Sequence, residues 1–353
     1  MTPEKVEFSR DGSSIVFHVD KGGFSPFVLT WEAPDEPDTP VTPPSTRYYE
    51  ITATAGEGGS ISPSGTHSYA AGSDVTFTIT PDEGWTVGDV TVDGVSYRQL
   101  GSYTFEDLDD DHTISVTFMR GSDPTSPDET GVSDWLNASD HVAYLHGYGD
   151  GSFTFGPENP MTRAEVAQMF YNLLLDKGMG DRDVAFEDVP EGAYYAEPVR
   201  VLASRGILNG TGPETFEPNR AITRAEFVAI AMRFSNGAPD GENTFVDVPE
   251  DAWYRDYVVG ATSFGWIYGY QDGSHRFGPD DTITRGQATM VTNRMLWRSC
   301  DTAWALEHLD QVKTFVDLPQ GHYAFFDVVE ATNAHDYERV GGTRYEDWTG
   351  LRE

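Results

Sequence analysis

Three arginines in the same local sequence stand at identical intervals and could carry binding chemistry. Each is the second residue of a repeated tetrapeptide, found at Thr162–Glu165, Thr223–Glu226 and Thr284–Gln287. An arginine beside the free backbone amides of a helix N-terminus forms a bidentate site for a carboxylate or phosphate. The arginines could instead pair with carboxylates of the protein itself. The aspartates at repeated positions are Asp150, Asp188, Asp247, Asp272 and Asp317. The residues alone leave both interpretations open.

The tetrapeptides also predict the helices that position these arginines. Thr-x-x-Glu before an apolar run is a capping box, in which the threonine hydroxyl and the glutamate each satisfy a free backbone amide. The third copy keeps this logic with Gln287. A further helix with apolar residues at helical spacing is expected before the second and third copies, ending at Gly206 and Gly265. The repeated unit is therefore helix, glycine loop, helix.

Two more features repeat, and they are out of phase with the tetrapeptides. Glycine loops begin at Gly147, Gly210 and Gly269. A Phe-x-Asp-Val/Leu-Pro opening occurs at Phe186–Pro190, Phe245–Pro249 and Phe315–Pro319. The first repeat lacks this opening, and the last opening has no Thr-Arg helix after it. We infer that segment 315–337 packs beside the first repeat and closes a pseudo-threefold bundle, which protects the ends of the array.

These motifs, over about 133–337, resemble the S-layer homology (SLH) family, the triplicated module by which Gram-positive bacteria hold proteins on their cell wall. The resemblance implies an all-α helical domain. Its expected boundaries are 133–340 for the domain, about 133–180, 181–240 and 241–300 for the repeats, 315–337 for the closing segment and 341–353 for a tail.

The resemblance also implies a ligand and the residues that bind it. SLH modules are thought to bind secondary cell wall polysaccharide, often through a pyruvate ketal, which is a fixed carboxylate. Arg163, Arg224 and Arg285 would receive the carboxylate, and the loop glycines would let the backbone approach it. Aromatic residues after the openings would carry the sugar, although they could equally pack in the protein: Tyr195, Trp253, Tyr254 and Tyr323. Because the third repeat has Gly286–Gln287 in place of Ala-Glu, we rank the Arg285 cleft below the other two.

The N-terminal third predicts β-structure. Segment 1–33 contains a hairpin pattern and resembles the last strands of an immunoglobulin-like domain. A proline-rich linker follows at 34–47. Residues 48–119 alternate with a period of two and, through Gly84–Trp85 and Val92–Gly94, resemble a small β-grasp-like repeat of the internalin B-repeat type. A second linker is expected at 120–132.

Composition excludes several classes of partner and cofactor. The chain has 353 residues and a formal net charge of −35, so nucleic acid and anionic membranes are poor partners. The single cysteine, Cys300, excludes an internal disulfide and a cysteine-based zinc site. We expect no cofactor and no metal, because the histidines show no ligand spacing: His141, His146, His308, His322 and His335. No signal peptide or membrane span is recognised, which suggests the tail of a longer precursor.

Together the sequence predicts a secreted, non-catalytic cell-wall anchor at the bacterial surface, with the β-domain as a stalk. Self-association in a surface layer fits the same resemblance. The alternative is an adhesin in which the β-repeat binds a protein partner. Catalysis is disfavoured, because no nucleophile, metal or nucleotide motif appears. With 58 acidic residues in the chain, almost any two could be nominated as the carboxylate pair of a glycosidase, so such a pair carries no signal.

Overall fold

The structure is a computed structural model that describes residues 8–10, 15–17, 47–82, 84–97, 100–120, 124–149, 151–236, 241–270, 272–340 and 344–352. The chain divides into two compact units, Met1–Ser45 and Thr46–Glu353. In the first unit, β1 (Phe8–Arg10) pairs antiparallel with β2 (Ile15–Phe17), as the hairpin pattern predicted. The immunoglobulin-like assignment and almost all of the 34–47 linker lie outside the described residues.

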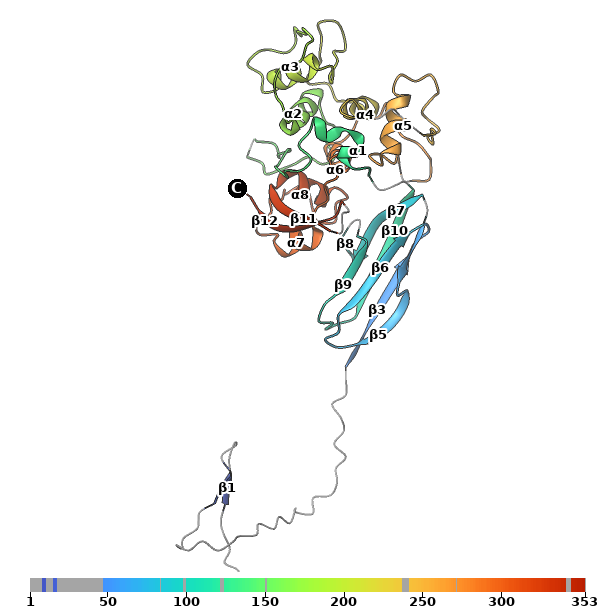
Figure 1. The fold of residues 1–353 in the computed structure, drawn as a ribbon, viewed down its shortest axis with the longest axis vertical. Helices are drawn as coiled ribbons and strands as arrows, with labels where there is room; N and C mark the ends of the chain where they lie inside the picture. Colours follow the sequence, from blue (N-terminus) through green and yellow to red (C-terminus); the bar gives the residue numbers. More distant parts are fainter. Residues whose placement is uncertain are drawn as a thin grey trace, which may run out of the picture. The chain divides into compact units, whose positions relative to one another are not determined.

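The β-domain within residues 47–120 consists of two sheets around an apolar core (Figure 1). The larger sheet has the strand order β5-β3-β10-β7-β8, and the smaller has the order β4-β6-β9. The strands are β3 (Tyr48–Ala55), β4 (Gly59–Ser62), β5 (Gly65–Ala70), β6 (Val75–Pro81), β7 (Trp85–Val92), β8 (Val95–Ser96), β9 (Ser102–Phe105) and β10 (His112–Arg120). Strands β3 and β10 run parallel, whereas the other pairs are antiparallel. Alternate side chains such as Ile51 and Phe77 are fully buried, which confirms the predicted period of two.

The helical domain follows from residue 124 and has its own core (Figure 1). Its helices are α1 (Pro127–Thr130), the 3₁₀ helix η1 (Val132–Asp134), α2 (Arg163–Leu173), α3 (Ala196–Ser204), α4 (Arg224–Met232), α5 (Arg255–Ser263), α6 (Arg285–Met295), α7 (Thr302–Glu307) and α8 (Phe325–Thr332). Two strands, β11 (His335–Arg339) and β12 (Glu346–Leu351), form an antiparallel pair.

The predicted capping boxes begin α2, α4 and α6. In each helix the threonine hydroxyl accepts the amide of the third helical residue, and that residue's side chain accepts the threonine amide. Gln287 performs this role in α6 as the glutamates do in α2 and α4. Gly206 and Gly265, which follow α3 and α5, have φ of +76° and +70°, so the predicted glycine stops are confirmed.

The closing segment packs beside the first repeat, as we inferred from the phase of the motifs. Helix α8 pairs with α6, as α3 pairs with α2 and α5 with α4. The backbone amides of Tyr144 and Leu145 both donate to the carbonyl of Ala331 in α8. The three Thr-Arg segments also contact one another in a cycle, through bridges between Pro160 and Thr284, Thr162 and Ala221, and Thr223 and Thr282.

Three boundary and class predictions need correction. The expected linker 120–132 contains α1, whose Thr130 is fully buried, so the helical domain begins earlier. The expected tail 341–353 contains β12, whose Trp348 is only 4% exposed. Since β12 pairs with β11, the domain is helical with a two-stranded sheet and is not all-α. An alternating strand of six residues carries too little signal to be separated from a tail by sequence.

Candidate functional site

Each of the three arginines crosses to the glycine loop of a neighbouring repeat. Arg163 Nε donates to the Phe216 carbonyl at 2.8 Å, and Nη2 donates to Asn209. Arg224 Nε donates to Phe277, and Arg285 Nε to Phe155, again at 2.8 Å.

The side chains are 5–9% exposed. The guanidinium carbon of Arg163 lies 4.5 Å from the centre of the Phe216 ring, and the other two stack in the same way. The arginines therefore join neighbouring repeats.

The aspartates of the Phe-x-Asp openings bind backbone amides and not these arginines, so the pairing of the arginines with Asp188, Asp247 and Asp317 is wrong. Asp317 accepts the amides of Phe155 and Gly156, each at 2.8 Å. Asp188 and Asp247 accept the equivalent amide pairs in their own repeats. A carboxylate has two oxygens and can receive two parallel backbone N–H groups, so these aspartates hold the loops in shape. Asp272 accepts the amide of Ser274, and Asp150 lies outside the described residues.

The helix N-termini are also not free, contrary to the expectation of an open anion site there. The amides of Arg163 and Ala164 donate to the carbonyls of Arg220 and Pro218. The same pair of bonds begins α4 and α6, to carbonyls of the 279–281 and 157–159 segments. Neighbouring repeats therefore occupy the donors that a ligand would need, because the cycle of repeats places a backbone carbonyl opposite each helix end.

The loop glycines make room for phenylalanine rings of the openings. A Cβ at Gly147 would lie 2.5 Å from Phe315 Cε1, and the same clash would occur between Gly210 and Phe186. Gly269 is blocked by Phe245 at 2.4 Å and has φ of +68°. The glycines thus serve packing between the opening and the loop. Backbone contact with a ligand at these positions stays a prediction.

The predicted aromatic residues divide into exposed and half-buried members. Trp253 is 61% exposed, whereas Tyr195, Tyr254 and Tyr323 are half-buried against the core. Tyr323 Oη lies 3.2 Å from Thr284 Oγ1, at the cap of α6. Tyr194, next to Tyr195, is 63% exposed. Burial and the Glu165 carboxylate raise the pKa of Tyr194.

Two tyrosines that we did not select from the sequence lie directly on the arginines. Tyr148 lies 4.7 Å from the guanidinium carbon of Arg285, and Tyr270 lies 4.8 Å from that of Arg224. Both belong to the Gly-Tyr start of the glycine loops, where the second repeat has Thr211. The recurrence of Gly-Tyr was the available signal for this contact.

The three clefts differ in the side chain that the neighbouring capping box presents. Arg285 Nη1 donates to Glu165 Oε1 at 3.1 Å, which is an ion pair. Arg224 Nη1 donates to the neutral Gln287 Oε1 at 3.2 Å. From the sequence we expected the third repeat, which has Gln287 in place of glutamate, to lack a carboxylate at the Arg285 cleft. In the structure Gln287 contacts Arg224 instead, so the Arg224 cleft is the one without that carboxylate. The reason is that Arg224 and Arg285 each contact the capping residue of the next repeat in the cycle.

The Arg163 cleft has a third arrangement. Its neighbouring glutamate, Glu226, is paired with Arg220 at 2.6 Å. Burial lowers the pKa of Arg163 and of Arg224 from the ordinary value. Arg224 is therefore the arginine whose neighbouring capping residue, Gln287, carries no charge.

Comparison with known proteins agrees with this geometry. The SLH (S-layer homology domain) family model matches residues 133–167, 185–228 and 244–289, once for each repeat. The divergent InlB B-repeat domain model matches residues 49–122. The chain therefore carries three S-layer homology repeats after a divergent InlB B-repeat domain, and the comparisons support a location at the cell surface.

Its relatives include proteins named for the cell surface and several polysaccharide-degrading enzymes. The chain is 30% identical over 228 residues to cell surface glycoprotein 1 of Acetivibrio thermocellus, which covers 61% of this chain and 9% of the relative. It is 29% identical over 208 residues to a cellulosome-anchoring protein of the same organism, 56% of this chain and 44% of the relative. The surface-layer 125 kDa protein of Lysinibacillus sphaericus is 30% identical over 151 residues, 42% of this chain and 13% of that protein. The chain thus spans less than half the length of these relatives.

None of the helices in the described ranges is both long and apolar enough to cross a bilayer.

Proposed function

We propose that the helical domain anchors its protein non-catalytically to the cell wall by binding an anionic secondary cell wall polysaccharide. The observation that carries the proposal is the cycle of three buried arginines, each of which contacts the glycine loop of the next repeat. The family and its anchoring relatives support the same role. A carboxylate on the sugar, such as a pyruvate ketal, is the group that an arginine fork receives well.

Within this function, the Arg224 cleft is the strongest candidate for the anion. Its guanidinium contacts the neutral Gln287 and stacks on Tyr270, whereas the equivalent Arg285 is already paired with Glu165. A ligand carboxylate at Arg285 would displace or repel that glutamate. Tyr270, which stacks on Arg224, gives the sugar a ring on which to pack. The β-domain then serves as the stalk.

The test is retention by purified Gram-positive cell-wall sacculi before and after hydrofluoric acid removes the wall polymer. We expect retention of the chain that is lost after stripping. Gln287→Glu should weaken retention about tenfold, equivalent to roughly 1.4 kcal/mol, because the new carboxylate would neutralise Arg224 as Glu165 does Arg285. The capping box survives this change, because the other two boxes use glutamate.

The matched control is Glu165→Gln, which makes the reverse change at the Arg285 cleft and should not weaken retention. Equal loss in both variants would contradict the assignment of the anion to Arg224. Retention that survives stripping would contradict polymer binding altogether and direct attention to the β-domain as an adhesin.

A further inference from the structure

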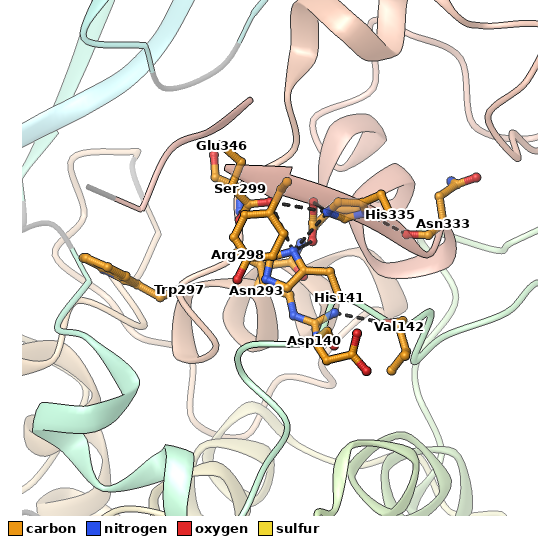
Figure 2. A network of polar contacts seen from close by, with 12 residues as sticks. Asp140, His141, Val142, Asn293, Trp297, Arg298, Ser299, Asn333, His335 and Glu346 are labelled. Atoms are coloured by element: carbon orange, nitrogen blue, oxygen red, sulfur yellow. Dashed lines mark hydrogen bonds and ion pairs between the residues drawn. The ribbon is translucent and has the colours of Figure 1, made fainter. Parts of the chain in front are cut away.

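Four metal-binding side chains from separate segments meet inside the helical domain. His141 lies in the first repeat ahead of α2, Glu330 lies on α8, His335 begins β11 and Glu346 begins β12. Three of these residues are fully buried, and Glu346 is 5% exposed. One ligand atom from each lies within 4.8 Å of all the others. Figure 2 shows His141, His335 and Glu346 turned toward one another.

The distances between these atoms match the edges of a small coordination polyhedron. His141 Nδ1 lies 3.0 Å from His335 Nε2 and 3.1 Å from Glu346 Oε2. Glu330 lies 3.3 Å from His141 Nδ1 through Oε1 and 3.5 Å from His335 Nε2 through Oε2. A tetrahedral ion with bonds of about 2.0–2.1 Å to N and O has ligand atoms roughly 3.3–3.4 Å apart. One central ion would therefore reach all four residues with little movement.

Glu330 has no other partner that would explain its burial. Both of its oxygens are buried and accept no hydrogen bond among the described residues. The nearby Arg298 directs its Nη groups to the carbonyls of Asn137, Asp140 and Val142 instead. A buried carboxylate without hydrogen bonds is costly, so it requires a cation or a proton at the cluster.

The surroundings orient the ligand atoms toward the centre. The other ring nitrogen of His335, Nδ1, lies 2.9 Å from the Asn333 carbonyl, which favours a bare Nε2 on the cluster side. Glu346 Oε1 accepts from Arg339 Nη1 at 2.8 Å and from the Ser299 amide at 3.0 Å, so Oε2 is left for the cluster. Such support of histidine and carboxylate ligands from outside is typical of metal sites.

We propose that His141, Glu330, His335 and Glu346 form a structural site for a divalent transition-metal ion, Zn²⁺ in the first instance. Two imidazoles and two carboxylates in a closed four-coordinate arrangement suit Zn²⁺, whereas Ca²⁺ and Mg²⁺ prefer six or more oxygens. The ion would join the first repeat to α8 and the β11–β12 hairpin. It would thereby clamp the two ends of the helical domain together.

The test uses the tag-free chain, stripped with EDTA and titrated with Zn²⁺ by calorimetry, with metal content measured by mass spectrometry. We expect about one Zn²⁺ per chain and a melting temperature that rises with Zn²⁺ and falls with EDTA. Glu330→Gln should weaken Zn²⁺ binding by at least about 100-fold and abolish the thermal response to EDTA. The exposed His275→Gln is the control and should behave as wild type.

Co²⁺ provides a readout that does not depend on any variant. The wild-type chain should show the intense visible absorption of tetrahedral Co²⁺ without a thiolate charge-transfer band, because Cys300 is not a ligand. Absence of stoichiometric Zn²⁺ and of this spectrum would overturn the proposal and leave a proton-shared histidine–glutamate network. Equal Zn²⁺ affinity in wild type and Glu330→Gln would overturn it as well.

Discussion

The repeated aspartates and the repeated arginines hold the loops of the helical domain through different backbone groups. The aspartates receive pairs of loop amides, and the arginines donate to loop carbonyls and stack on phenylalanine rings. Every loop is therefore held from one side by a carboxylate and from the other by a guanidinium. The neighbouring capping residue then decides the net charge beside Arg224 and Arg285.

At this scale Asp247 should make stability depend on pH. Burial alone would raise the pKa of Asp247, but the amides of Phe277 and Gly278 outweigh it and hold the pKa below its ordinary value. Its stabilisation is therefore fully present above the unfolded pKa and is lost as the pH falls through the folded pKa. Asp247→Asn should cost about 1–3 kcal/mol at neutral pH.

Denaturant titrations between pH 7 and pH 3 would measure this. The variant's stability should fall less steeply over that range than that of wild type, because asparagine does not titrate. The exposed Asp251→Asn is the control. Parallel pH curves for wild type and Asp247→Asn would contradict the role given to this carboxylate.

The elements fit together through the openings, which pack on glycine loops of the adjoining segment. Phe315 and Phe155 have ring centres 5.4 Å apart, and the corresponding pairs in the other repeats have 5.4 and 5.7 Å. The closing segment therefore completes the first repeat in the same way that each later opening serves its own repeat.

Gly147→Ala should destabilise the helical domain. The new Cβ would meet Phe315 and the Thr154 carbonyl at 2.5 and 2.6 Å, and the backbone atom cannot move aside cheaply. We expect a loss of about 1–3 kcal/mol, typical of overpacking, measured by thermal or urea unfolding. Gly149→Ala in the same loop is the matched control, because a Cβ there meets nothing within 4 Å. Similar effects of the two substitutions would refute the packing explanation.

For the whole molecule, the C-terminal hairpin is part of the helical domain's core. The ring of Trp348 on β12 stacks on His335 with centres 3.8 Å apart and lies 5.6 Å from the centre of Trp304. The last described residues of the chain therefore belong to the same domain as the buried residues of α1 and η1.

Trp348→Ala should cost about 3–5 kcal/mol of folding free energy, as expected for removal of a buried aromatic side chain. Unfolding followed by tryptophan fluorescence and circular dichroism would measure this. Trp253→Ala is the comparison, because that side chain is 61% exposed and its loss should leave stability nearly unchanged. A negligible effect of Trp348→Ala would mean that residues 344–352 behave as the tail that we first expected.

The sequence by itself determined the local features of this protein. The period, the three capping boxes, the glycine stops and the alternating strands of the β-domain depend on residues a few positions apart, and the structure confirms them. The packing of segment 315–337 beside the first repeat was also predictable. The first repeat lacks a Phe-x-Asp opening and the opening at Phe315 has no Thr-Arg helix after it, so the two complete each other.

Only the tertiary structure decided which groups the arginines contact and which acids and histidines meet. Arg285 contacts His146 and Glu165, which lie 139 and 120 residues before it in the chain. His141 likewise meets His335 and Glu346 from the other end of the helical domain. Such contacts depend on how the cycle of repeats closes, and no local spacing records that closure. For the same reason the histidines looked scattered in the sequence, although the fold brings two of them within 3.0 Å.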